Sequence, residues 1–309
     1  MKTRRLGTSG LKVSEVGLGC NNFGMRIDQK ATQAVVDAAL DAGITLFDTA
    51  DIYGGTKSEE FLGKALGKRR GDIVLATKFG MRIGDDERRK GGSRRWIMRA
   101  VEDSLQRLGT DWIDLYQFHA PDPDTPIEET LRALDDLVTQ GKIRYIGNSN
   151  FTGWQIADAD WAAAGATRFV SAQNQFSLLE RKVEFEVLPA CEHFGLGFLP
   201  FFPLASGLLS GKYKRGEKPP EGTRLAAWGS RGAAALSERN FDRIEKLTAW
   251  AQARGHTLLE LAFAWLLGHE VVSSVIAGAT SPGQATANAA TAGWALTPDE
   301  VKEVGDLIA

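Results

Sequence analysis

The chain has 309 residues, of which 43% are hydrophobic and 25% are charged, and these proportions are typical of a globular protein rather than a disordered or fibrous one. A formal net charge of −2 gives no electrostatic reason to bind nucleic acid or a membrane surface, so we expect neither as a partner. Two cysteines, Cys20 and Cys191, are too few for a disulfide framework or a cysteine metal site, and we expect no metal.

The N-terminal segment predicts a β-hairpin rather than a targeting signal. Residues 1–10 contain basic side chains without the apolar stretch of a signal peptide. No run of about 18 apolar residues occurs, so we expect a cytoplasmic protein without a membrane span. Strand-like runs at 3–7 and 11–17 flank the turn-forming Gly10, and we expect them to form a hairpin that plugs one end of the fold.

From residue 17 onward, short apolar runs alternate with helical patterns. Runs of about four to eight apolar residues bounded by Gly or Asp are typical of buried parallel strands. Helical patterns cover 29–43, 94–109, 127–141 and 181–195, and each ends at a glycine, as helix C-termini often do. The strand-like runs are 17–19, 44–48, 72–78, 111–119, 143–149, 168–175, 196–203 and 272–278.

Eight strands that alternate with helices predict a (β/α)8 TIM barrel with an N-terminal β-hairpin, forming a single domain over residues 1–309. Two segments, 80–93 and 206–235, interrupt the alternation after the third and seventh strands. Loops at the carboxyl ends of barrel strands build the pocket, so we expect these two segments to shape a binding site.

Four polar residues follow or end the apolar runs, namely Asp48, Tyr53, Lys78 and His119. Taken alone, Asp48 also suits a helix cap and Tyr53 a packed ring. Together they suit proton transfer, because a nearby ammonium from Lys78 would lower the pKa of the Tyr53 phenol. Asp48 would hold that lysine, and His119 would hydrogen-bond a substrate oxygen. The set contains no strong nucleophile, which indicates that a cofactor supplies the hydride.

At these residues the chain resembles the aldo-keto reductase superfamily, and the resemblance runs from residues 4–20 to residues 276–290. It implies a (β/α)8 barrel that binds NADPH, with Asp48, Tyr53, Lys78 and His119 as the catalytic residues. The segment IGNSNF resembles the family's clamp for the nicotinamide carboxamide. That likeness assigns Ser149, Asn150 and Gln173 to the clamp.

The same resemblance implies contacts for the rest of the cofactor. Phe201 would stack on the nicotinamide, and small residues after it would surround the pyrophosphate. At the adenosine end many members carry cations for the 2′-phosphate, whereas this segment has none, so we expect a modest preference for NADPH and some use of NADH. The implied contacts are Phe201, Pro203, Leu204, Ser206, Gly207, Leu208, Ser210, Lys212, Gly278, Thr280, Gln284 and Asn288.

Transfer of a hydride from NADPH to a small aldehyde or ketone, with Tyr53 as general acid, is therefore the expected function. Asn22, Phe23 and Phe79 are the expected substrate contacts. Residues 17–24 do not match the G-x-G-x-x-G fingerprint, so we do not expect a Rossmann dehydrogenase. Two other functions remain open: a nicotinamide-binding regulatory subunit that senses redox state, and a cofactor-free barrel isomerase or lyase.

Overall fold

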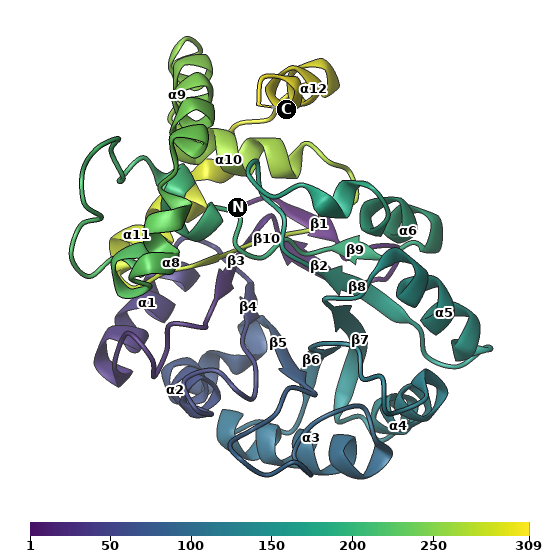
Figure 1. Cartoon of the computed structure of the whole chain (residues 1–309). Coiled ribbons are helices and arrows are strands. Elements are labelled where there is room, and N and C mark those ends of the chain that lie inside the picture. Colours follow the sequence, from purple (N-terminus) through teal and green to yellow (C-terminus); the bar gives the residue numbers. More distant parts are fainter. Residues whose placement is uncertain (309) are drawn as a thin grey trace.

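The computed structural model describes residues 1–308, and within them eight parallel strands form one sheet in the order β10-β3-β4-β5-β6-β7-β8-β9. The sheet closes on itself, because Phe198 bridges to Val272 and the Ile276 amide donates to the Pro200 carbonyl at 3.1 Å. The strands form a ring inside the helices (Figure 1). The predicted (β/α)8 barrel is therefore confirmed.

Each of the eight predicted strand-like runs contains a strand. The shortest is β9, which has two residues because Pro200 and Pro203 lack the N–H that a longer strand would donate. The bounds are β3 Val16–Gly19, β4 Leu46–Asp48, β5 Val74–Phe79, β6 Ile113–Phe118, β7 Ile143–Ser149, β8 Phe169–Gln173, β9 Gly197–Phe198 and β10 Val275–Gly278.

Several helices begin where a capping side chain accepts from a free N–H group. Ser93 accepts from the Trp96 amide at the start of α3, and Thr257 forms a capping box with Glu260 at the start of α10. The bounds are α1 Gln29–Asp41, α2 Lys57–Leu66, α3 Arg94–Leu108, α4 Ile127–Thr139, α5 Gly153–Ala163, α6 Val187–Phe194, α7 Arg224–Ala227, α8 Ser230–Ala235, α9 Glu238–Gln252, α10 Leu258–Leu267, α11 Pro282–Ala290 and α12 Pro298–Asp306.

The helix expected over 181–195 is interrupted. A 3-10 turn covers Lys182–Glu184, and α6 starts only at Val187. Pro189 explains the break, since a proline fits the first turn of a helix but removes a hydrogen bond and clashes in its interior. The continuous helix predicted from the pattern was wrong at its N-terminal half.

The N-terminal hairpin is present as predicted. Strand β1, Thr3–Arg5, pairs antiparallel with β2, Lys12–Ser14. Its apolar side chains Leu6 and Val13 are fully buried. They join one cluster with barrel-strand side chains, so the hairpin plugs the barrel interior. The cluster comprises Leu6, Val13, Leu46, Ala76, Leu115, Leu199 and Ile276.

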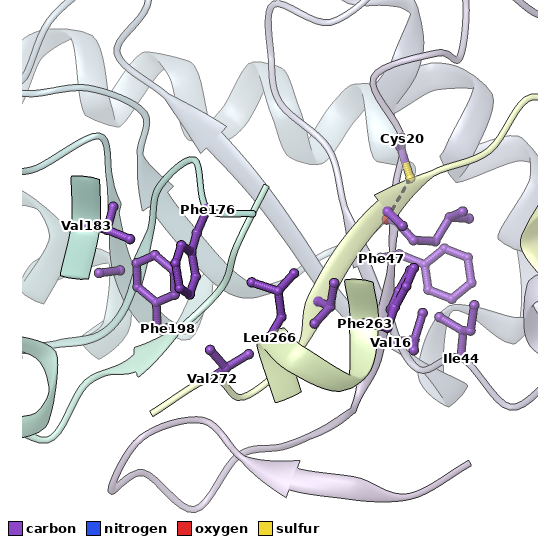
Figure 2. Packing of buried hydrophobic residues seen from close by; sticks show 14 of the residues in the cluster. Val16, Cys20, Ile44, Phe47, Phe176, Val183, Phe198, Phe263, Leu266 and Val272 are labelled. Carbon is purple, nitrogen blue, oxygen red and sulfur yellow. Dashed lines mark hydrogen bonds between the residues drawn. The ribbon is translucent and has the colours of Figure 1, made fainter. Parts of the chain in front are cut away.

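The period-2 alternation of the strands separates this interior from a larger outer core. Leu46 faces inward, whereas the next residue, Phe47, packs with the outer core between sheet and helices. Figure 2 shows Val16 and Phe47 near Phe263 and Leu266 of α10, with Phe176 and Phe198 in a neighbouring part of that core. The residue two positions after an inward apolar residue also faces inward, nearer the carboxyl end of the strand. Asp48 follows Leu46 in this way, and Lys78 follows Ala76.

Within residues 1–308, no helix has the length and apolar character needed to cross a membrane.

Candidate functional site

A cavity of about 790 Å³ opens at the carboxyl ends of the strands. The 80–93 segment contributes Met81 to its wall, and the 206–235 segment contributes several residues. Most of the sequence-predicted site residues line it: Asn22, Asp48, Tyr53, His119, Ser149, Asn150, Gln173, Phe201, Pro203, Leu204, Ser206, Gly207, Ser210, Lys212, Gly278, Thr280, Gln284 and Asn288.

Four other predicted residues do not line the cavity. Phe79 is fully buried in the outer core, where its ring stacks on Tyr116 and Phe118 at centroid distances of 4.7 and 5.1 Å. Phe23 and Leu208 also pack in the outer core. Phe79 follows Lys78 by one residue, so the strand alternation turns it away from the site. The fourth, Lys78, lies just below the cavity wall.

Lys78 and Asp48 form a buried ion pair at the ends of β5 and β4. The Lys78 Nζ donates to Asp48 Oδ2 at 2.6 Å and to the Thr49 carbonyl at 2.9 Å, and the lysine side chain has no solvent exposure. Burial lowers the pKa of Lys78. The Asp48 carboxylate and the Tyr53 phenol raise this pKa by a larger amount, so the net pKa lies above its ordinary value. Lys78 is therefore a charged ammonium at neutral pH.

Tyr53 lies on the β4–α2 loop with its ring 5.1 Å from the Lys78 Nζ. Burial raises the pKa of Tyr53, and the charge of Lys78 with its hydrogen bond to the phenol lowers it. The burial effect is larger, so the net pKa of Tyr53 lies above its ordinary value rather than below it. The sequence had predicted a net lowering, which was wrong for this chain because pattern alone does not show how dry the site is.

His119 directly follows β6, and its ring lies edge-on to Tyr53 with the centroids 5.8 Å apart. Burial and the charge of Lys78 lower the pKa of His119 from 6.5 to about 3. The imidazole is therefore neutral at physiological pH. Its Nδ1 is buried, and no residue of the described chain bonds to it.

Gln117 is a buried residue of the site that sequence reasoning missed. Its Nε2 donates to Asp48 Oδ1 at 2.9 Å, and the Nε2 of Gln173 donates to the same oxygen at 3.0 Å. Gln117 follows the inward-facing Leu115 by two residues and pairs with Lys78 in the sheet register. The two-residue alternation of the strand was the signal in the sequence that could have found Gln117, because it places residues 115 and 117 on the same inward face.

Ser149 and Asn150 are joined to the same group of residues. The Ser149 hydroxyl donates to the Gln173 carbonyl at 2.8 Å, and Asn150 Nδ2 donates to the His119 carbonyl at 2.9 Å. Asn150 has a φ of 61°, a left-handed conformation that asparagine tolerates better than most residues. The end of β7 is thus tied to both β6 and β8.

The segment after β9 has an unusual run of positive φ angles. Phe202, Ala205 and Ser206 have φ values of 53°, 45° and 60°, and Gly207 has 98°. Left-handed conformations in non-glycine residues store strain and tend to occur at functional sites. Backbone hydrogen bonds hold the turn, since the Ala205 amide donates to the Phe202 carbonyl at 2.9 Å and the Gly207 amide donates to the Leu204 carbonyl at 2.8 Å. A side chain at Gly207 would collide with the Lys212 ammonium, since an added Cβ lies 2.7 Å from Nζ.

Three cations line the cavity near the adenosine-end residues. Burial, then Arg26 and Arg224, lower the pKa of Lys212, and burial and Arg26 lower the pKa of Arg224. Arg224 contacts Asn22 Oδ1 at 3.4 Å, and Asn22 Nδ2 donates to the Ala279 carbonyl at 3.3 Å, which connects Arg224 to the end of β10. Sequence reasoning included Lys212 but missed Arg26 and Arg224, because both arginines are distant in sequence from residues 278–288.

The segment after β10 forms the start of α11. The Ser281 side chain caps this helix by accepting from the backbone N–H of Gln284. The side-chain Oε1 of Gln284 accepts from the backbone N–H of Thr280 at 2.8 Å. The Gln284 oxygen is therefore used within the chain, and the residue lines the cavity. Asn288, one turn further, also lines the cavity and is buried.

Comparison with known proteins agrees with this geometry. The model of the Aldo/keto reductase family matches residues 15–309. The chain belongs to this family. It is 41% identical over 292 residues to an uncharacterized oxidoreductase of Bacillus subtilis, covering 90% of this chain and 87% of the relative. The family supports an oxidoreductase that uses a nicotinamide cofactor on small carbonyl substrates.

Other relatives of this aldo/keto reductase include a named enzyme and a channel subunit. A versiconal hemiacetal acetate reductase of Aspergillus parasiticus is 34% identical over 330 residues, which cover 98% of this chain and 95% of the relative. A probable voltage-gated potassium channel subunit beta of Oryza sativa is 37% identical over 298 residues, covering 93% and 90%. Both an enzyme and a channel subunit are thus similar to nearly the whole chain.

Proposed function

We propose that this aldo/keto reductase reduces an aldehyde or ketone with NADPH, and that Tyr53 is the general acid. The observation that carries the proposal is the buried ammonium of Lys78, which lies between the Asp48 carboxylate, 2.6 Å away, and the Tyr53 phenol at the cavity wall. A buried charge needs such partners, and their place at the mouth of the barrel suits chemistry better than stability.

The cavity suits a nicotinamide dinucleotide. Its volume of about 790 Å³ lies in the range of cofactor sites, and its residues extend from the clamp at Gln173 to Asn288 of α11. The Lys212 ammonium and the Ser206 side chain also line the cavity, and they suit a pyrophosphate. The donors and cations together match a ligand with several negative charges.

When bound, NADPH supplies the hydride. The chain's own residues supply the proton and hold the substrate. Tyr53 keeps its phenol protonated at neutral pH, because its pKa is raised, and the Lys78 ammonium stabilises the phenolate that remains after donation. His119 is neutral, so it orients the substrate oxygen by a hydrogen bond without competing as an acid.

Two of the three cations favour NADPH over NADH. A 2′-phosphate is a dianion near neutral pH, and Arg224 with Arg26 provides charge that residues 278–288 lack. No acidic residue forms an ion pair with Arg26, Lys212 or Arg224 within the described chain. The modest preference expected from sequence is replaced by a proposal of strong selectivity for NADPH.

A regulatory subunit is the second candidate, because relatives named as potassium channel beta subunits are 37% identical to the chain. NADPH absorbance followed with a panel of sugar aldehydes, aromatic aldehydes, α-dicarbonyls and ketosteroids separates the candidates. Consumption that depends on a carbonyl compound supports the reductase. Tight binding without consumption in single-turnover experiments supports the regulatory subunit, and absence of binding favours a cofactor-free isomerase or lyase.

A further inference from the structure

Gln117 lies under the cofactor clamp without reaching the cavity. It is fully buried on β6, beside Lys78 on β5 and Gly147 on β7 in the sheet register. Its inward position follows from the strand alternation, and below it Leu115 belongs to the apolar barrel interior. A carboxamide at this depth needs partners for both ends of its amide group, since each unsatisfied polar group would cost free energy.

The Asp48 carboxylate determines which way both glutamines point. A carboxylate only accepts hydrogen bonds, and Asp48 Oδ1 lies 2.9 Å from one end of the Gln117 amide and 3.0 Å from one end of the Gln173 amide. Both of these ends must therefore be nitrogen. An amide flipped the other way would place an oxygen against the carboxylate and repel it.

Gln117 then uses the remaining N–H of Gln173. Its Oε1 accepts from Gln173 Nε2 at 3.1 Å, so both N–H groups of Gln173 are bound inside the protein. The remaining polar atom of the Gln173 side chain is Oε1, which accepts no hydrogen bond from residues 1–308. Because Gln173 lines the cavity, this oxygen is the atom it offers to a ligand.

We infer that Gln117 is a positioning residue that fixes the Gln173 carboxamide with Oε1 toward the cavity, as an acceptor for the N–H of the nicotinamide carboxamide. The same Asp48 carboxylate binds Lys78 through its other oxygen at 2.6 Å, so one carboxylate aligns both the proton-donating group and the clamp. This inference rests on the proposed function, since it takes a nicotinamide cofactor as the ligand.

The test compares dissociation constants of NADPH and of its acetylpyridine analogue, in which a methyl group replaces the carboxamide nitrogen. The wild-type protein should bind NADPH about tenfold more tightly, the effect of one hydrogen bond. Gln117→Met keeps the length of the side chain and removes its amide, which frees Gln173 to turn. This variant should lose most of the preference for NADPH, by weakening NADPH and leaving the analogue nearly unchanged.

Two controls separate positioning from general damage. Tyr116→Phe changes the next residue on β6, whose buried hydroxyl has no partner in the described chain, and it should keep the wild-type preference. In a Gln173→Met background, Gln117→Met should have no further effect on the preference, because Gln117 acts through Gln173. A structural role would instead weaken both ligands equally and would be additive with Gln173→Met.

The outcomes are distinct for the two proposals. If the wild-type protein binds both ligands equally well, or if Gln117→Met weakens both in proportion, the positioning role is wrong while NADPH binding stands. If the wild-type protein binds neither ligand, the proposed function fails and this inference fails with it. The wild-type comparison needs no variant, so a poorly folded Gln117→Met protein does not prevent the test.

Discussion

At the scale of single residues, the chemistry of the site depends on how little water surrounds four side chains. Burial raises the pKa of Tyr53 and lowers the pKa of His119, so both are uncharged at neutral pH. Lys78 remains charged because Asp48 and Tyr53 compensate its burial. The same dry environment thus keeps an acid protonated, an imidazole neutral and an ammonium charged.

Replacement of the phenol tests the general acid. Tyr53→Phe removes the transferable proton but preserves the ring, so turnover should fall about 10²–10⁴-fold while the dissociation constant for NADPH changes little. Steady-state kinetics and fluorescence titration measure the two quantities. Retention of more than about a tenth of wild-type turnover, with chemistry shown to be rate-limiting, would remove Tyr53 from this role.

The pH dependence of carbonyl reduction should have a single alkaline limb. The rate falls as pH rises through the pKa of Tyr53, because the acid form is lost, and that pKa lies above its ordinary value. His119, with a pKa of about 3, should add no limb between pH 5 and 8. A profile of kcat/KM measures this, and a limb in that interval that disappears in His119→Gln would contradict the assignment.

Lys78→Met should move the alkaline limb to still higher pH and reduce the rate. The variant removes the cation that lowers the pKa of Tyr53, so the phenol becomes a weaker acid. Asp48→Asn should act in the same direction but more weakly. Additive effects of the two substitutions on transition-state free energy in the double variant would show that Lys78 and Asp48 do not act together.

At the scale of elements, the segment after β9 brings together charges that are far apart in sequence. Its positive-φ run at 202–207 and the short helix α7 place Lys212 and Arg224 along the cavity, opposite Arg26 of the β3–α1 loop. The Arg26 guanidinium donates to the Gly222 carbonyl at 2.5 Å, which joins the two loops. The proposed selectivity for NADPH depends on this loop contact more than on α11.

Arg224→Gln should weaken NADPH about tenfold or more and leave NADH nearly unchanged, because only the 2′-phosphate loses a charge-assisted contact. Arg215→Gln is the matched control. It removes a cation from the same segment whose charge is already paired with Glu238, Asp242 and Glu245. The dissociation constants of NADPH and NADH for the wild-type protein and both variants test this prediction. If Arg224→Gln weakened NADH binding as much as NADPH binding, Arg224 would not contact the 2′-phosphate.

At the scale of the whole molecule, the barrel is plugged at one end and carries the cavity at the other. The hairpin inserts Leu6 and Val13 into one end, and the inward side chains of the strands complete an apolar interior below Asp48 and Lys78. Closure between β9 and β10 then fixes the positions of all strand ends. The polar site therefore lies directly above a packed apolar barrel interior.

Leu6→Ala should lower the free energy of unfolding by about 2–5 kcal/mol, because it leaves a cavity under the barrel. Urea unfolding followed by circular dichroism measures the loss, and activity of the folded variant should persist. Trp161→Ala is the control, since this tryptophan is 80% exposed on α5 and its removal should cost little. Equal losses for the two variants would show that the hairpin is not a plug.

The sequence by itself determined the barrel and four of the residues proposed for catalysis. Strand runs and helix patterns are local, so their periodicity is readable, and polar residues at strand ends must meet once the strands form a ring. The resemblance to the aldo-keto reductases, rather than the pattern, implied most of the residues that line the cavity. The pattern did not resolve side-chain direction near the ends of strands, and for that reason Phe79 was expected in the pocket.

Only the tertiary structure decided the remainder. It placed Gln117 beside Asp48, brought Arg26 and Arg224 to the wall of the cavity, and showed that Tyr53 is buried enough to raise its pKa. Contacts of this kind join residues far apart along the chain, and the degree of burial depends on every element that covers the site. Neither quantity is encoded in local periodicity, because both arise from packing of the closed barrel.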